Sequence, residues 1–468
     1  MTKMQNGKTV GRILGRFPSG KIIRDPHPNT SSMIYGATGS AKTTSVLVPA
    51  VQSLLADTAL ALIINDVKDG EVAAQIGSMC RKYGRKFGVL DDFHVLGADY
   101  PYRYSLNPFG AVVSTRKEYP RDQLFANDTA CHALIEEPSE PDKNKYFRDT
   151  PREEMDLGIR ILLDNRPDLA TPGGLCAMMG DPHVWKSAVD IAAEEGDAAL
   201  QSRARQSMDM RDSDPEHYFQ HLRAALTALR IYEPGSALHE AGFDTELTHQ
   251  QIIDEGWVFC LVQPQRHTAR LGAHFALHIQ SFMHAQMSGK SGRALYLLDE
   301  LCNAPLKSAV DAVTILRGYR GASLYIAQSR ADVERKYGAR ECTILEDNCP
   351  TKQWLSFTNY DDAERVSRAI GEETSINPSV GVSSDKVDFS GNIGLGKERI
   401  FSADALMNLP PNEQIIYLRG IGWVHCEKFF QNQAAPYCHD LDANPYEGGR
   451  LEPDPLITLP TPGIRRAS

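Results

Sequence analysis

Short apolar segments recur along the chain and alternate with stretches of helical periodicity. Their hydrophobicity is continuous rather than alternating, which is typical of strands buried on both faces of a parallel sheet that helices cover. The pattern therefore predicts an α/β fold with a mostly parallel central sheet. The predicted strands are SSMIY (31–35), ALALIINDV (59–67), KFGVLDD (86–92), GWVFCLVQP (256–264), RALYLLDE (293–300), SLYIAQS (323–329) and KQWLSFT (352–358).

Strand-like segments stop between residues 145 and 231, where helical patterns take over. In DPEHYFQHLRAALTALRIY, Asp214 is suited to cap a helix and Pro215 to occupy its first position. One stripe of this helix carries Tyr218, Leu222, Ala225, Leu226 and Leu229. We therefore expect an all-α insertion at 145–231 that divides the sheet domain into 31–144 and 232–431.

Three segments lie outside this pattern. Residues 1–30 are predicted to form a basic N-terminal arm, either solvated or attracted to anionic lipid or DNA. Residues 376–398 are rich in Gly, Ser and Asp and are predicted to be a mobile loop. The Pro- and Gly-rich tail, 432–468, is predicted to be extended over the surface or disordered. The basic residues of the arm are Lys3, Lys8, Arg12, Arg16, Lys21 and Arg24.

Composition narrows the class of protein. The 468 residues are 42% apolar and 24% charged, as in ordinary globular proteins, and the net charge of −10 argues against a protein that coats nucleic acid. The nine cysteines contain no C-x-x-C pair, so reduced thiols are expected rather than a zinc ribbon or disulfide framework. No apolar run approaches the ~18 residues that span a bilayer, so we expect a cytoplasmic chain without a membrane span of its own.

The segment GATGSAKTTS follows the first strand and precedes a helical pattern. It differs by one residue from the phosphate-binding loop G-x-x-x-x-G-K-[ST], because Ala41 replaces the second glycine. Lys42 is placed to reach the β- and γ-phosphates of ATP, and Thr43 to bind Mg²⁺. If Ala41 must be left-handed, its methyl group costs about 1–2 kcal/mol. The predicted nucleotide-binding residues are Gly36, Ala37, Thr38, Gly39, Ser40, Ala41, Lys42, Thr43 and Thr44; the alternative is an ordinary Gly/Ser turn.

RALYLLDEL is an apolar strand that ends in two carboxylates. An ATPase needs one carboxylate in the Mg²⁺ shell and one to polarise the attacking water, both at the strand edge beside the phosphate loop. Asp299 is the predicted metal-side residue and Glu300 the general base. Alone, such a pair is more often a solvated turn, and it is the phosphate loop upstream that favours the catalytic interpretation.

Further polar residues could complete the site. Gln328 ends a buried strand and could sense the γ-phosphate, or simply end the strand. Arg317 and Arg320 could reach the γ-phosphate of a neighbouring subunit in a ring, or be solvated or paired. Asp66, after the second predicted strand, would lie beside the same crevice or be a turn carboxylate.

Other candidate motifs are weaker. GNIGLGKE, from Gly391 to Glu398, resembles a phosphate loop but lacks both the hydroxyl residue and a buried strand before it. We also expect no metal cage and no nucleophilic triad, because His27, His132 and His267 have no partners at ligand spacing.

Taken in order, these motifs resemble the TraG/VirD family of type IV secretion coupling proteins, which are RecA-like P-loop ATPases. The segments that carry the resemblance are GRFPSG, GATGSAKTTSVLVPAV, DVKDGE, YSLNPF, LYLLDEL, LYIAQSRADVERKYG, ILEDNCPTKQWLSFTNYDDAERVSRAIG and FSADALMNLPPNEQIIYLRG. The resemblance implies a nucleotide-binding domain interrupted by an all-α domain, a homo-hexamer with ATP between subunits, and action at the cytoplasmic face of the bacterial inner membrane. Because only about thirty residues precede the phosphate loop, membrane attachment would need a partner or the basic N-terminal segment.

The resemblance leaves three functions to compare. The first is an ATP-driven coupling protein that brings single-stranded DNA with its relaxase, or a protein substrate, to a secretion channel. The second is a nucleotide-binding substrate receptor with little or no motor activity, which the replacement at Ala41 and the acidic balance would explain. The third, which the flanking motifs do not support, is a genome-packaging translocase of the FtsK or HerA kind.

Overall fold

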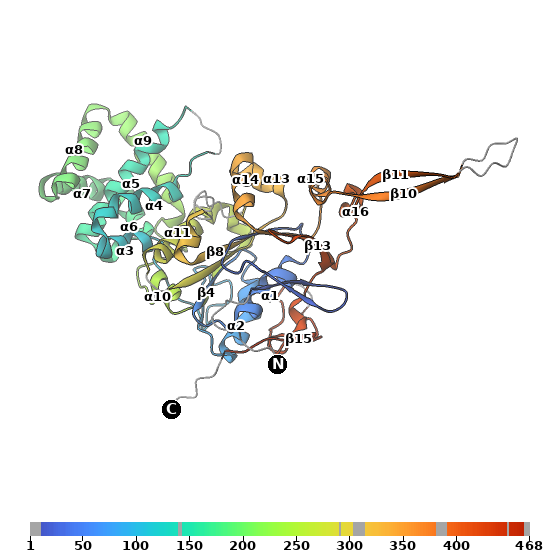
Figure 1. Ribbon diagram of the computed structural model, residues 1–468. Coiled ribbons are helices and arrows are strands. Elements are labelled where there is room, and N and C mark those ends of the chain that lie inside the picture. Colours follow the sequence, from blue (N-terminus) through green and yellow to red (C-terminus); the bar gives the residue numbers. More distant parts are fainter. Residues whose placement is uncertain are drawn as a thin grey trace.

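The computed structural model describes residues 11–138, 143–289, 292–302, 314–380, 391–446 and 449–462. Within these ranges the dominant element is a sheet of eleven strands in the order β2-β1-β13-β12-β9-β3-β8-β7-β4-β6-β5. Helices cover both faces of the sheet, and a separate block of helices stands at one end (Figure 1).

The apolar segments of the sequence form the parallel part of this sheet, as predicted. Neighbouring strands from β9 to β5 pair only in parallel. Their bounds are β3 (Ser32–Tyr35), β4 (Leu60–Asp66), β5 (Phe87–Leu90), β6 (Val258–Val262), β7 (Arg293–Leu298), β8 (Gly321–Ala327) and β9 (Thr351–Trp354). The parallel α/β architecture is therefore confirmed.

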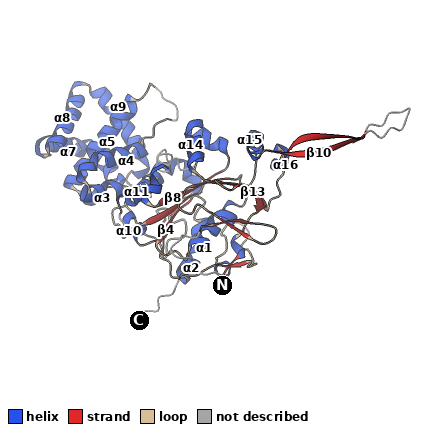
Figure 2. Cartoon of the chain, viewed as in Figure 1, coloured by secondary structure: helices blue, strands red, loops and turns tan. Residues whose placement is uncertain are grey.

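Each central strand contributes side chains to two cores, which explains its continuous hydrophobicity. In β4, Leu62 and Ile64 pack with helices α1 (Val48–Leu54) and α2 (Glu71–Lys82). Ala61 and Ile63 face the opposite way, into the core that contains α11 (Thr268–Ser288). Figure 2 shows the helices on the two sides of the strands. The same core includes side chains of α10 (His249–Asp254), α13 (Arg330–Tyr337), α14 (Ala339–Asn348), α15 (Tyr360–Ile370) and α16 (Ala403–Met407).

The helical block begins earlier than the sequence pattern indicated. Helices α3 and α4 precede residue 145, and both pack against α11. Their apolar stripes are weak, because the residues they bury include Thr115, Asn127 and Ala130. At the other end of the block, the predicted cap is present: the Asp214 side chain accepts from the backbone N–H of His217. The block comprises α3 (Gly110–Glu118), α4 (Gln123–Leu134), α5 (Tyr146–Asn165), α6 (Pro172–Gly180), α7 (Pro182–Glu195), α8 (Ala198–Ser213) and α9 (Pro215–Leu229).

The N-terminal segment is part of the sheet rather than a solvated arm. β1 (Ile13–Arg16) and β2 (Ile22–Arg24) join β12 (Glu413–Leu418) and β13 (Gly422–Glu427) in an antiparallel extension. Arg12 is buried 3.9 Å from Asp25, and burial lowers the pKa of its guanidinium to about 10. Residues 1–10, with Lys3 and Lys8, lie outside the described residues.

The segment predicted to be a mobile loop forms strands on either side of residues 381–390, which lie outside the described residues. β10 (Glu372–Val380) and β11 (Gly391–Arg399) pair antiparallel in a ribbon that projects from the main body (Figure 1). The sequence of the ribbon, INPSV before residues 381–390 and GNIGLGKE after them, does not alternate between apolar and polar residues. The sequence therefore carried no periodic signal for these strands.

The C-terminal tail is packed rather than disordered. Tyr437, Leu441 and Leu459 are buried in the core beneath α1 and α2. Two short strands, β14 (Ala434–Ala435) and β15 (Ile457–Thr458), pair in parallel. The expectation of a loose tail followed its Pro and Gly content and missed these separated apolar anchors.

The helices and the cysteines bear on two expectations from the sequence, the absence of a membrane span and the reduced state of the thiols. Of the helices in the described ranges, none combines the length and the apolar character needed to cross a bilayer. All nine cysteines are buried free thiols, and the reduced state expected from their spacing fits this arrangement.

Candidate functional site

Strand register brings the predicted site residues to one edge of the sheet. Tyr35 at the end of β3 pairs with Ala327 of β8, and Leu298 of β7 pairs with Tyr325 of β8 and Asn65 of β4. The carboxyl ends of β3, β8, β7 and β4 are therefore neighbours. Ligands of open α/β sheets bind at such an edge.

The predicted phosphate loop connects β3 to the following helix. The helix begins at Thr43 with a wide turn (η1, Thr43–Leu47) and continues as α1. Gly39 and Ala41 both have left-handed backbones, with φ of 79° and 69°. Ala41 thus has a backbone conformation that glycine tolerates better than any other residue. For alanine this conformation costs about 1–2 kcal/mol. We expect β3 and η1, which flank the loop, to hold this conformation, so the cost should lower stability more than affinity.

Lys42 is buried at the centre of the site. Its ammonium group donates to the backbone carbonyls of Gly36, at 2.9 Å, and Ala37, at 3.2 Å. It also lies 3.5 Å from Oε1 of Glu300. The lysine that the motif assigns to phosphate is therefore held by the loop and by the predicted general base.

Glu300 connects the end of β7 to the end of β8. Its other carboxylate oxygen, Oε2, accepts from the Gln328 amide at 3.0 Å, and its backbone N–H donates to Oδ1 of Asp299. Its φ of 49° is left-handed, a conformation that costs a non-glycine residue free energy and often occurs at functional sites. The structure thus places Lys42, Glu300 and Gln328 in one contact chain.

Two buried aspartates lie beside this chain. Burial, and then the charge of Glu300, raise the pKa of Asp299 to about 6. Burial also raises the pKa of Asp66 to about 7, although Asp66 accepts from the backbone N–H of Ala73. Buried carboxylates with raised pKa values lack sufficient positive charge nearby, and a divalent cation bound by oxygen ligands would supply it.

The buried hydroxyls of the loop also fit a bound ligand. Ser40 is buried, and its Oγ has no hydrogen-bond partner within the described part of the chain. Thr43 is buried at the start of the helix, whereas Thr38 is exposed and Thr44 is partly exposed. These positions are compatible with the predicted Mg²⁺ and phosphate ligands, and the assignment of each residue remains a prediction.

The two arginines lie elsewhere. Arg317 and Arg320 are exposed around the short helix η6 (Leu316–Tyr319), immediately before β8. They are therefore at the amino end of a seven-residue strand whose carboxyl end carries Gln328. The strand separates the two ends by about 20 Å, so neither arginine joins the phosphate loop of its own chain.

The structure adds residues that sequence reasoning missed. Lys428 is buried and donates to the backbone carbonyls of Ser40, at 3.1 Å, and Pro411, at 2.7 Å. Burial lowers its pKa to about 8. The Ser356 hydroxyl accepts from the backbone N–H of Ala37 at 3.1 Å. Lys428 lies outside the motifs, and Ser356 lies in a segment that carries the resemblance but was given no role in the site. Both reach the loop only through tertiary contacts.

The C-terminal tail also reaches this edge of the sheet. Asn444 donates to Oε1 of Glu71 at 2.7 Å, and the Tyr446 hydroxyl donates to the carbonyl of Asp69 at 3.0 Å. Glu71 and Asp69 belong to the DVKDGE segment that follows β4. The tail therefore supports the loop beside Asp66.

The second phosphate-loop-like motif, 391–398, lies in strand β11 of the projecting ribbon.

Comparisons with known proteins agree with this geometry. Residues 293–411 match the family described as the TraM recognition site of TraD and TraG. These residues, called the TraG/TraD segment below, are similar to that family. The TraG/TraD segment contains Asp299, Glu300 and Gln328, so two of the three residues of the contact chain lie inside it. A comparison with curated protein sequences finds no match.

Solved structures share the fold over nearly the whole length. The bacterial conjugative coupling protein TrwB without its first 70 residues is 14% identical, covers 92% of each chain and gives a TM-score of 0.64. TrwB with ADP and Mg²⁺ is also 14% identical, with 91% of this chain and 95% of that chain covered and a TM-score of 0.61. VirB4 of Thermoanaerobacter pseudethanolicus is 15% identical, with 94% and 100% covered and a TM-score of 0.53. The expected RecA-like P-loop NTPase fold is confirmed.

Replacing Ala41 by glycine tests where the strain of the loop acts. Ala41→Gly should raise the free energy of unfolding by about 0.5–1 kcal/mol, because glycine relieves the left-handed backbone. ATP affinity should change less than about twofold, since the flanking strand and helix, rather than the nucleotide, are expected to fix the loop conformation. Urea unfolding and nucleotide titration measure the two effects.

The matched control is Ala37→Gly, at a position of negative φ in the same loop. It should lower stability by about 0.4–1 kcal/mol, because glycine there only increases the entropy of the unfolded chain. Tighter ATP binding by Ala41→Gly of tenfold or more would contradict the inference that the strain precedes binding.

Asp66→Asn tests the burial of charge beside the site. The raised pKa of about 7 means that the folded chain holds a proton that the unfolded chain releases near pH 4. Stability should therefore fall as the pH rises from 4 to 7, and the variant should lack this component. At pH 8, Asp66→Asn should be more stable than wild type by about 1–3 kcal/mol, the loss of the charge being partly offset by a buried amide. Unfolding at pH 4.5 and pH 8 decides the sign, and a gain independent of pH would contradict it.

Proposed function

We propose that the chain is an ATP-hydrolysing coupling protein that drives single-stranded DNA with bound relaxase, or a protein substrate, to a type IV secretion channel. The observation that carries the proposal is the contact chain of Lys42, Glu300 and Gln328 at one sheet edge, with Asp299 beside it. The TraG/TraD segment and the TrwB-like fold support the coupling role. TrwB itself has been solved with ADP and Mg²⁺.

In this proposal each residue has a distinct task. Lys42 exchanges its contacts with the Gly36 carbonyl and Glu300 for the β- and γ-phosphates of ATP. Thr43 and Asp299 would hold Mg²⁺, which would supply positive charge to offset the negative charge of the transferred phosphoryl group. Release of Lys42 leaves Glu300 free to orient the attacking water as general base. Gln328, which donates to Glu300, can then register the γ-phosphate and its loss.

The exposed arginines suggest how subunits cooperate. Arg317 and Arg320 cannot serve the site of their own chain, but a neighbouring subunit could present them to it. We propose a homo-hexamer with ATP at each interface, in which one of these arginines acts in trans. The proposed location is the cytoplasmic face of the bacterial inner membrane, beside the secretion channel.

One observation favours the alternative of a nucleotide-binding substrate receptor with little motor activity. Lys42 contacts two carbonyls and a carboxylate of its own chain, and the neighbouring Ala41 has a left-handed backbone. ATP must displace these contacts, which would make turnover slow. The two functions differ in whether DNA stimulates hydrolysis.

Phosphate release with and without single-stranded DNA distinguishes the motor from the receptor. Lys42→Ala should reduce turnover by about 100-fold or more, because it removes the cation from the phosphates. Glu300→Gln should reduce turnover by about 10²–10⁴-fold while ATP still binds, since the amide cannot accept a proton. Lys186→Ala, at an exposed position of α7, is the control and should retain wild-type turnover.

Equal rates in wild type, Lys42→Ala and Glu300→Gln would remove the hydrolytic assignment. ATP binding without DNA-stimulated turnover, and without the steep salt dependence of phosphate contacts, would select the receptor.

Mixing two inactive variants tests the arginines in trans. Lys42→Ala lacks the phosphate site, and the double variant Arg317→Ala/Arg320→Ala lacks the arginines. In a randomly mixed ring about a quarter of the interfaces would combine an intact site with an intact arginine, so activity should partly return. Each variant alone should be inactive, and a mixture as inactive as its components would contradict the trans role.

A further inference from the structure

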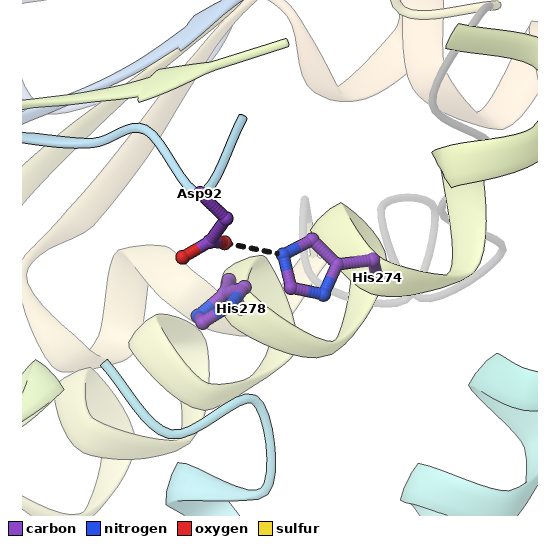
Figure 3. A group of neighbouring side chains, drawn as sticks. All are labelled: Asp92, His274 and His278. Carbon is purple, nitrogen blue, oxygen red and sulfur yellow. Dashed lines mark hydrogen bonds and ion pairs between the residues drawn. The ribbon is translucent and has the colours of Figure 1, made fainter. Parts of the chain in front are cut away.

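A second cluster of ionisable side chains lies beside the last strand of the parallel sheet, away from the phosphate loop. Asp92 follows β5, the last strand of the sheet, whereas the loop follows β3. Five strand spacings separate β3 from β5, or about 24 Å. His274 and His278 lie one helical turn apart on α11 and face Asp92 (Figure 3). This cluster is therefore independent of the proposed ATPase site.

Both histidines are completely buried and lie close to the carboxylate. His274 Nε2 is 3.0 Å from Oδ2 of Asp92, and the potential ligand atoms of the three residues all lie within 4.8 Å of one another. The second nitrogen of His274, Nδ1, is 3.2 Å from the hydroxyl of Tyr232. Nε2 is hydrogen-bonded to Asp92 in this structure. When the Nδ1–H donates to the Tyr232 hydroxyl oxygen, Nε2 instead carries a lone pair that a cation can share with Asp92.

His278 has an unfilled position that points to a ligand. Its Nδ1 is 3.2 Å from Nε2 of His249, and its own Nε2 is buried without a hydrogen-bond partner among the residues described. Burial, and then the neighbouring His274 and His249, hold the pKa of His278 well below its usual value. If His278 donates its Nδ1 proton to His249, its Nε2 presents a free lone pair. The other tautomer would instead bury an unpaired N–H, which is costly.

We propose that Asp92, His274 and His278 bind a divalent transition-metal ion of the zinc class. Neutral imidazole nitrogens and a carboxylate are its usual ligands, with bonds of about 2.0–2.2 Å. Two ligand atoms on one tetrahedral ion then lie about 3.3 Å apart, close to the 3.0 Å between His274 Nε2 and Asp92 Oδ2. Tyr232 and His249 supply the outer hydrogen bonds that orient metal-binding histidines.

The position of the cluster indicates a structural role for the ion. Asp92 lies on the segment that leads from β5 to the first helix of the helical block, α3. Tyr232 ends the short helix η4 (Arg230–Tyr232), which follows the last helix, α9. Both connections of the block thus meet at α11. A bound ion would fasten the base of the helical block to the sheet domain without taking part in nucleotide chemistry.

Metal binding by the full-length chain tests the proposal directly. After treatment with a chelator, wild-type protein should take up about one Zn²⁺ per chain, measured by mass spectrometry, and Co²⁺ should give a visible absorption spectrum. Asp92→Asn and His278→Gln should each weaken Zn²⁺ binding by more than about 100-fold, and Tyr232→Phe by about tenfold. Zn²⁺ should raise the melting temperature of wild type and not that of the two ligand variants.

The matched control is His284→Gln, a substitution on the same helix at a histidine that contacts Thr115 instead of the cluster. It should retain wild-type Zn²⁺ affinity. If His278→Gln does not fold, Asp92→Asn decides alone, because Asp92 is partly exposed at the cluster and its asparagine keeps the side-chain volume. Failure of wild type to bind Zn²⁺ or Co²⁺ above the level of Asp92→Asn would overturn the proposal. Neither outcome depends on ATP hydrolysis.

Discussion

The parallel pairing of the central strands is the constraint on which the site depends. Because β3, β8, β7 and β4 run in the same direction, their carboxyl ends lie side by side. Residues as distant in sequence as Lys42, Glu300 and Gln328 thereby come into direct contact. No single loop could bring these groups together, and each is anchored by a strand buried on both faces.

The site is assembled at a cost in electrostatics and backbone strain. Asp66 and Asp299 are buried with raised pKa values, whereas burial lowers the pKa of Lys428. Ala41 and Glu300, on the two sides of the Lys42 contact, both have left-handed backbones. Non-glycine residues adopt such conformations only where the surrounding structure enforces them. The sheet edge therefore combines buried ionisable groups with left-handed backbones at Ala41 and Glu300.

The helical block is attached through a small number of contacts around α11. Helices α3 and α4 pack on α11, and Asp92 and Tyr232, from the two connections of the block, both approach His274. Asp92 places a carboxylate next to the buried imidazoles of His274 and His278. The position of the proton on each imidazole decides which hydrogen bonds the cluster forms. A change in this cluster would alter how firmly the block is held, while leaving the phosphate loop intact.

Local signals in the sequence were sufficient for much of this protein. Continuous apolar runs identified the parallel strands, the Asp-Pro pair marked the start of α9, and the motif around Lys42 located the phosphate loop, because each depends on residues near one another in the chain. The antiparallel strands β1 and β13, the ribbon β10–β11 and the anchored tail were missed, since their stability comes from distant partners or from exposed pairing without periodicity.

Among the site residues, the same division holds. The sequence alone determined that Lys42, Asp299 and Glu300 follow buried strands, but not that Lys428 and Ser356 support the loop. In the sequence, Arg317 and Arg320 lie between the strand before Glu300 and the strand before Gln328. The direction of β8 shows that they lie at the edge of the sheet opposite to Gln328. The histidines of α11 had no recognisable partner until folding brought Asp92 beside them. Chemistry carried by neighbouring residues was readable directly, whereas chemistry shared between distant segments was decided by strand order and burial.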